Sequence, residues 1–260
     1  MIGLLAAGVL SPFYLTVAPE VRSSYVSLGK IVEDRPMQVT FVRAGYDTGL
    51  LGRIGFYNWD VSSLTDRRLD AHHHALYHTE FGPTWSYDIA FSDDWRLCND
   101  LMYVWTLYRR FRNESSDGDF WWWQFAQTLE NPYVVPYYRV RRYVDGVYYF
   151  WYEVGLRRRF GFLQNFYVTP TLYADGGNDL NYKRVIGTRR HGSTWDYCGA
   201  TSVAFRLELG WQFCSEATAF VFVEQYEVVG DEARHANARS TYRCAHNDWT
   251  IGGAGVRFRF

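Results

Sequence analysis

Apolar and polar residues alternate with a period of two in many separate stretches of this chain, and this pattern constrains the fold more than any other feature. In TWSYDIAF (84–91), every second residue is aromatic or aliphatic. The same alternation runs through SVAFRLELGW (202–211), YYFWYEVGLR (148–157) and WWWQFAQTLE (121–130). Because successive side chains of a β-strand point to opposite faces, the pattern predicts strands with one apolar and one polar face. Helical periodicity never lasts longer than a turn or two, so the predicted fold class is all-β.

The alternating stretches predict about twelve strands, and the connections between them differ in length in a regular way. The strands are expected near 15–28, 37–46, 51–60, 74–91, 95–109, 120–130, 133–143, 147–159, 166–175, 198–211, 218–227 and 248–260. Short turns follow the even-numbered strands, whereas the third, ninth and eleventh strands are followed by long polar segments. The seventh strand is followed only by the tight turn VDG, which weakens the pattern. Short turns at one end and long loops at the other predict a transmembrane antiparallel up-and-down β-barrel, a single domain over 14–260. The alternative is a soluble sandwich or a lipocalin-type barrel.

The polar faces of these strands carry arginine and carboxylate residues, with almost no lysine. Only two lysines, Lys30 and Lys183, occur in the chain. Arginine suits fixed, hydrogen-bonded ion pairs, so the polar faces are expected to form a lumen of cross-strand pairs. The predicted lumen or pore-lining residues are Arg22, Arg53, Glu80, Asp88, Asp100, Glu130, Arg139, Arg141, Glu153, Arg157, Arg206, Glu208, Glu224 and Arg257. They comprise seven arginines and seven carboxylates, so strong ion selectivity is not expected.

The last six residues, GVRFRF, predict a strand that closes the barrel by pairing with the first strand. Val256, Phe258 and Phe260 would face lipid, and Arg257 and Arg259 would face the lumen or its rim. A terminal aromatic residue after alternating apolar positions also resembles the signal that bacterial barrel-insertion machinery recognises. That machinery and outer-membrane lipid are therefore expected partners.

Composition and the N-terminal stretch point to export and exclude some other classes. The formal net charge of −1 argues against nucleic acid as the main partner, and the mean hydropathy of −0.29 shows that the chain is not uniformly apolar. After the N-terminus there is no run of about 20 apolar residues, so helical membrane spans are not expected. Residues 1–13 are interpreted as a signal-peptide remnant or an N-terminal segment, although they lack a basic n-region. A buried N-terminal strand or plug is the alternative. The expected location is the bacterial outer membrane.

Two clusters invite a ligand-binding interpretation. His74, His78 and Glu80 share one strand face, but positions four apart on a strand are separated by about 13 Å, too far to share a metal ion. Neither a metal nor a cofactor is predicted. Trp121 and Trp123 are expected in an aromatic girdle on the lipid face, whereas Trp122 points inward and is the better ligand candidate.

A barrel enzyme that hydrolyses lipid or peptide is the main alternative function. Its candidate residues would be His191 with Ser193, or His235 with Asp231, all in long loops. Another alternative is a structural or adhesive barrel with a blocked lumen.

The four cysteines lack metal-binding spacing, and two of them are expected near the same rim. A bridge between Cys198 and Cys244 is hypothesised there, and Cys98 and Cys214 are expected near the opposite end.

Two stretches of the chain resemble the bacterial porin family called TorF. The first is SSYVSLGKIVEDRPMQVTF (23–41) and the second is NPYVVPYYRVRRYVDGVYYFWYEVGL (131–156). The family usually has an arginine before the first glycine, where this chain has Leu28. The resemblance implies a transport-type barrel with no defined substrate and no catalytic residues. The expected function is a channel for passive diffusion of small solutes, with the oligomeric state left open.

Overall fold

The chain forms a closed barrel of twelve antiparallel strands in the computed structural model, which confirms the predicted fold class. The structure describes residues 12–27, 30–33, 35–64, 76–110, 120–144, 150–178, 198–229, 234 and 247–260. Within these residues, no helix is long and apolar enough to span a bilayer.

Twelve strands make the barrel wall, one short strand pairs with a wall strand in the same sheet, and two short strands form a separate hairpin. The wall strands are β1 (Phe13–Arg22), β4 (Met37–Asp47), β5 (Arg53–Ser63), β6 (Leu76–Ala90), β7 (Arg96–Arg110), β8 (Phe120–Glu130), β9 (Val135–Tyr143), β10 (Phe150–Arg157), β12 (Phe166–Asn178), β13 (Cys198–Gln212), β14 (Ala217–Val228) and β15 (Asp248–Arg259). The short strands are β2 (Tyr25–Ser27), β3 (Lys30–Glu33) and β11 (Phe160–Leu163).

Each wall strand pairs with its neighbour in sequence, and the first and last strands close the ring. β15 pairs with β1 in the register Val17 to Phe258 and Glu20 to Gly255. Past the last strand, the amide of Phe260 donates to the carbonyl of Leu15 over 2.8 Å. The predicted closure by the final strand is therefore confirmed, and the row of alternating arginines and aromatics continues the wall up to the chain end.

One predicted strand is divided in the structure. The stretch 15–28 was expected to be continuous, but β1 ends at Arg22 and β2 pairs with β3 in a separate two-stranded sheet. The amide of Ser23 still donates to the carbonyl of Gly252 over 2.8 Å, so the chain leaves the wall at the end of β15. The continuous prediction was wrong because alternation alone does not indicate which strand the residues will pair with.

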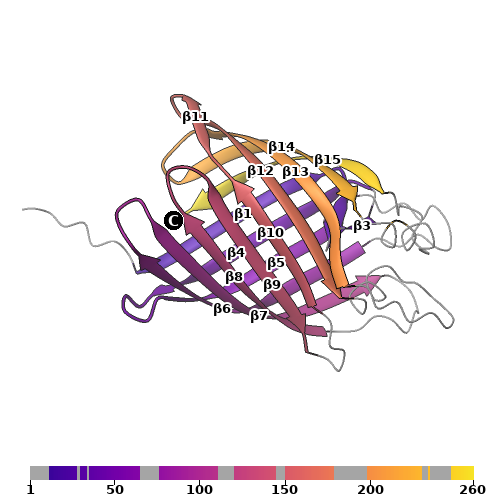
Figure 1. Cartoon of the computed structure of the whole chain (residues 1–260), viewed down its shortest axis with the longest axis horizontal. Coiled ribbons are helices and arrows are strands. Elements are labelled where there is room, and N and C mark those ends of the chain that lie inside the picture. The colour runs from indigo at the N-terminus through magenta and orange to yellow at the C-terminus, as the bar shows by residue number, and fades with distance from the viewer. Residues whose placement is uncertain are drawn as a thin grey trace, which may run out of the picture.

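The connections between wall strands separate into two kinds, one at each end of the barrel (Figure 1). Turns over 48–52, 91–95, 131–134 and 213–216 join strands at one end, where β11 extends the connection between β10 and β12 into a hairpin. We call this the short-turn end, and Phe260 lies there. The strand ends that border the connections 64–75, 111–119, 179–197 and 229–247 lie together at the opposite end, the long-loop end.

Alternation along the strands gives the barrel an apolar outer face. On β13, Val203, Phe205, Leu207, Leu209 and Trp211 are exposed, while Ser202, Ala204 and Glu208 are buried. Aromatic rings gather on the outer face, where Trp121 lies 5.1 Å from Trp105 between ring centroids. This arrangement matches the apolar band with aromatic girdles that a membrane-spanning barrel presents to lipid.

Several inner-face glycines lie beneath aromatic rings. A Cβ atom at Gly155 would lie 2.6 Å from the ring of Tyr137, and one at Gly210 would lie 2.1 Å from the ring of Tyr167. The absence of a side chain at these glycines lets the rings lie flat on the wall, so more aromatic side chains fit inside the barrel.

Candidate functional site

All fourteen predicted lumen residues lie on wall strands, and each forms an ion pair with another residue of the inner face. The pairs are Arg22–Glu20, Arg43–Asp100, Arg53–Asp88, Arg139–Glu153, Arg141–Glu80, Arg157–Glu130, Arg206–Glu208, Arg206–Glu224 and Arg257–Glu208. Their part in a conducting path stays a prediction.

One buried cluster surrounds Glu80 on β6. The Nη1 atom of Arg141 lies 3.5 Å from its Oε1 atom, and Nε2 of His78 lies 3.1 Å from the same oxygen. The hydroxyl of Tyr57 donates to Oε2 over 3.2 Å. Since a buried carboxylate is costly unless it is paired and hydrogen-bonded, these three partners together stabilise the charge.

Trp122 packs against the Arg141 side of this cluster. Its indole N–H donates to the hydroxyl of Thr106 over 2.7 Å, and the guanidinium of Arg141 lies 3.7 Å from its ring centroid. Trp122 faces inward as predicted but is fully buried under Arg141, so its ring is not open to a ligand. The interpretation of Trp122 as a ligand candidate was therefore wrong, because a cation–π contact already occupies its face.

A second cluster lies on the opposite strands, around Glu224 on β14. Arg206 reaches Glu224 over 3.6 Å and stacks on Phe222 at 3.7 Å. The hydroxyl of Tyr173 donates to Glu224 over 2.5 Å, and Tyr226 contacts both Tyr173 and Glu224. In both clusters the buried carboxylate is contacted by an arginine and by a tyrosine hydroxyl.

Contacts between arginine and aromatic residues join the two clusters into a ring around the interior, which we call the inner belt. Arg22 lies 5.5 Å from the ring of Trp59 and 5.7 Å from the ring of Phe222. Across the barrel, Trp151 lies 5.4 Å from Arg139 and 5.7 Å from Arg141. The remaining members are Phe41, Tyr57, Glu80, Glu153, Tyr173, Asp175, Arg206, Glu224 and Tyr226. The inner belt narrows the interior with side chains of the wall itself.

Some members of these clusters were not predicted from the sequence. Glu20 and Arg43 form ion pairs with Arg22 and Asp100, and Asp175 accepts hydrogen bonds from the amide and hydroxyl of Ser202 over 3.1 and 2.6 Å. Glu20 precedes Arg22 by two residues, so the alternation could have placed it on the same face. Arg43 shares its strand face with Val39 and Phe41. Because these neighbours are apolar, the alternation did not indicate that this face is the inner one.

Other predicted sites lie partly or wholly outside the described residues. His74, His191, Ser193, Asp231, His235 and Cys244 are not described, nor is the side chain of Cys198. Neither the alternative catalytic pairs nor the hypothesised bridge between Cys198 and Cys244 is therefore tested. Cys98 and Cys214 are free thiols near the short-turn end. Among the described residues, no group of histidine, cysteine and acidic side chains could hold a metal ion.

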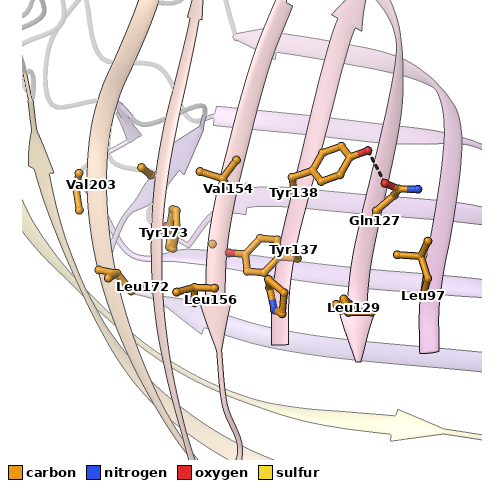
Figure 2. A pocket seen from close by; sticks show the side chains of 13 residues that line it. Leu97, Gln127, Leu129, Tyr137, Tyr138, Val154, Leu156, Leu172, Tyr173 and Val203 are labelled. Atoms are coloured by element: carbon orange, nitrogen blue, oxygen red, sulfur yellow. Dashed lines mark hydrogen bonds between the residues drawn. The ribbon is translucent and has the colours of Figure 1, made fainter. Parts of the chain in front are cut away.

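The outer wall contains an apolar groove of ≈ 570 Å³ (Figure 2). It crosses the six neighbouring strands from β7 to β13, and its apolar lining includes Leu97, Leu129, Val154, Leu172 and Val203. At one side the hydroxyl of Tyr138 donates to Gln127 over 2.5 Å. Its lining contains no serine, histidine or cysteine, and most of its residues are those that alternation turns toward lipid, while Tyr137, Gly155 and Tyr173 belong to the inner face. The groove therefore belongs to the wall and offers no nucleophile.

Val256, Phe258 and Phe260 lie on the outer side of the closing strand. The rings of Phe258 and Phe260 stack at 6.3 Å between centroids, and Phe260 is exposed. Recognition of these residues by insertion machinery stays a prediction.

Comparison with known proteins identifies the fold class as that of outer-membrane β-barrels. No protein-family profile and no curated protein sequence matches the chain. Among solved structures, an outer membrane channel of Pseudomonas putida F1 (COG4313) is 10% identical with a TM-score of 0.58, over 97% of each chain. The translocator domain of the autotransporter NalP from Neisseria meningitidis is 9% identical with a TM-score of 0.51, over 98% of this chain and 90% of that one. Outer membrane phospholipase A from Escherichia coli is 12% identical with a TM-score of 0.46, over 95% and 90%.

The likenesses to the channel and to the translocator domain show a shared fold.

Proposed function

We propose that this protein is a bacterial outer-membrane channel through which small polar solutes diffuse passively. The observation that carries the proposal is the charged inner face of a closed barrel. Arg139 stands in the middle of β9 and is 41% exposed although it pairs with Glu153, so the N–H groups that Glu153 does not bind require water inside the barrel. A hydrated path along the barrel axis supplies that water. The likeness to the Pseudomonas putida channel supports the same function at the level of the fold.

The inner belt sets the size of the solute in this proposal. Trp59, Trp151 and Phe222 lie against arginines around the interior, and in this proposal a solute passes these side chains. We also propose that the chain is related to the TorF porins, which 23–41 and 131–156 resemble. In this proposal the closing strand is the insertion signal, and the short-turn end faces the periplasm.

Planar-bilayer recording of the purified, refolded protein tests the proposal. The wild-type protein is expected to give unitary conductance steps. Trp151→Ala, which removes a ring from the inner belt, should enlarge each step. Trp121→Ala removes an exposed ring from the outer wall and should leave the step size unchanged. A wild-type protein that inserts and gives no steps at any voltage would contradict the channel function.

A barrel with a closed lumen is the second candidate, because most carboxylates and tryptophans of the inner belt are buried. The same recordings separate the two functions. Silence of the wild type together with steps from Trp151→Ala would favour a closed structural or adhesive barrel.

A further inference from the structure

Arginine and carboxylate residues are equal in number among the predicted lumen residues, but they are not equally exposed. In seven of the nine inner-face pairs the arginine side chain is more exposed than its partner. Arg139 is 41% exposed over a Glu153 that is 4% exposed, and Arg206 is 20% exposed over a Glu224 at 5%. In the two remaining pairs, Arg43–Asp100 and Arg157–Glu130, the exposed fractions of the two side chains are nearly equal. The carboxylates therefore lie against the wall, and guanidinium groups cover them on the side of the lumen.

This layering follows from side-chain length and donor geometry. Glu153 is held by two hydrogen bonds from Arg139, from Nε over 3.0 Å and from Nη2 over 2.6 Å. A guanidinium that donates from one edge keeps its other N–H groups free to face water. A solute in the lumen would meet hydrogen-bond donors with positive charge, while the opposing carboxylates would be screened behind them.

Near the short-turn end, two further arginines add positive charge. Arg159 and Arg259 are exposed, and neither forms an ion pair with a carboxylate of the described residues. Arg159 lies 3.6 Å over the ring of Tyr167, whose hydroxyl donates to Glu208 over 3.4 Å. Glu208 also pairs with Arg257 at 3.6 Å, and Arg259 lies two residues further along the same strand face.

The neighbouring turn forms no ion pair with this group. The amide of Arg259 donates to the carbonyl of Glu216 over 2.8 Å, but the side chains of Arg259 and Glu216 do not pair. Arg159, Arg257 and Arg259 therefore gather around Glu208, which Arg206 also engages. Around Glu208, positive side chains therefore outnumber the one carboxylate, while the exposed carboxylates of this end, Asp47, Asp93, Asp94 and Glu216, lie in or beside the turns.

We propose that the lumen is selective for anions and that its solutes are small carboxylate or phosphate compounds. This inference rests on the proposed channel function. The covering arginines supply charge-assisted donors that can replace the hydration of an anion along the path, and the arginine group around Glu208 adds positive charge on the inner face near the short-turn end. The formal balance of charges does not decide selectivity, because the buried carboxylates are not presented to the solute.

Reversal potentials in a KCl gradient test this proposal. The wild-type channel should reverse toward the chloride equilibrium potential. Conductance that reverses toward the potassium equilibrium potential would overturn anion selectivity and leave the channel function standing. The absence of any conductance would overturn the channel function itself, together with this inference.

Variants of a single ion pair provide the matched control. Arg139→Gln removes an exposed charge and should lower the chloride-to-potassium permeability ratio by about two-fold or more. Glu153→Gln removes the buried partner from the same pair and should change the ratio much less. Glu130→Gln, which removes a half-exposed carboxylate, should raise the ratio more than Glu153→Gln does. Equal and opposite shifts from Arg139→Gln and Glu153→Gln would show that exposure does not matter and would overturn the proposal. Heat-modifiable electrophoretic mobility checks that each variant is folded.

Discussion

At the scale of single residues, this barrel is defined by how its arginines are paired. Arg141 is nearly buried between two tryptophans and a carboxylate, whereas Arg157 and its partner Glu130 are about half exposed. An arginine–glutamate pair therefore contributes differently to the free energy of unfolding when it is buried and when it is exposed. A buried carboxylate that loses its arginine keeps its full desolvation cost, while an exposed one recovers its hydration.

Arg139→Ala should accordingly destabilise the barrel far more than Arg157→Ala. The first change leaves the buried Glu153 without its charged partner and should cost about 2–3 kcal/mol of unfolding free energy. The second breaks a pair in which both side chains are about half exposed and should cost less than about 1 kcal/mol. Urea unfolding of the two variants in the same lipid or detergent gives both values. Equal losses would mean that Glu153 is hydrated in the lumen.

At the scale of elements, each strand separates lipid-facing from inward-facing residues, but the polarity of these two faces varies. Most strands are apolar outside and polar inside. At the long-loop ends of β4 and β5 the order is reversed, since Met37, Val39 and Val61 are fully buried inside, and Gln38 and Asp60 face outward. Asp60 accepts a hydrogen bond from Thr79 of β6 over 2.7 Å on that outer side. These strand ends form a small apolar core beneath a polar outer surface, as expected where the wall rises above the apolar part of the membrane.

The two faces of β13 should respond differently to substitution. Leu207→Arg places a charge on the exposed apolar side and should cost about 2–4 kcal/mol if the site lies near the bilayer midplane. Glu208→Gln keeps the acceptor for Tyr167 and the size of the side chain, so folding should be retained while conductance changes. Folding yield into liposomes measures the first effect, and bilayer recording measures the second. If both variants failed to fold equally, the outer face would be a protein core and not a lipid-facing wall.

At the scale of the whole molecule, the separation of connection lengths gives the barrel two different ends. β1 and β15 close the ring along the length of β1, and the arginines around Glu208 gather near the short-turn end. Long connections with several basic residues join the strands at the other end. In an outer-membrane barrel, short turns face the periplasm and long loops face the outside.

Trypsin treatment of intact cells should therefore cleave the connections within 64–75, 179–197 and 229–247, each of which contains arginine. Arg158 and Arg159, beside the β11 hairpin, should be spared until the outer membrane is permeabilised. Peptide mass spectrometry before and after permeabilisation locates the cuts. Cleavage at Arg158 or Arg159 in intact cells would indicate the opposite orientation.

The sequence by itself determined the strands, their approximate bounds and the closure of the barrel, because a period of two and the spacing of turn residues are local properties of the chain. It also placed Arg139 and Glu153 on adjacent strands. Tertiary structure decided what local patterns do not contain: that Arg43 faces inward among apolar residues, that Arg141 covers Trp122, and that the first predicted strand divides after Arg22. It also decided which charge of each pair is exposed. Which side chain of a pair is exposed depends on its length and on how near the other strands of the barrel lie. The alternation of a single strand contains neither.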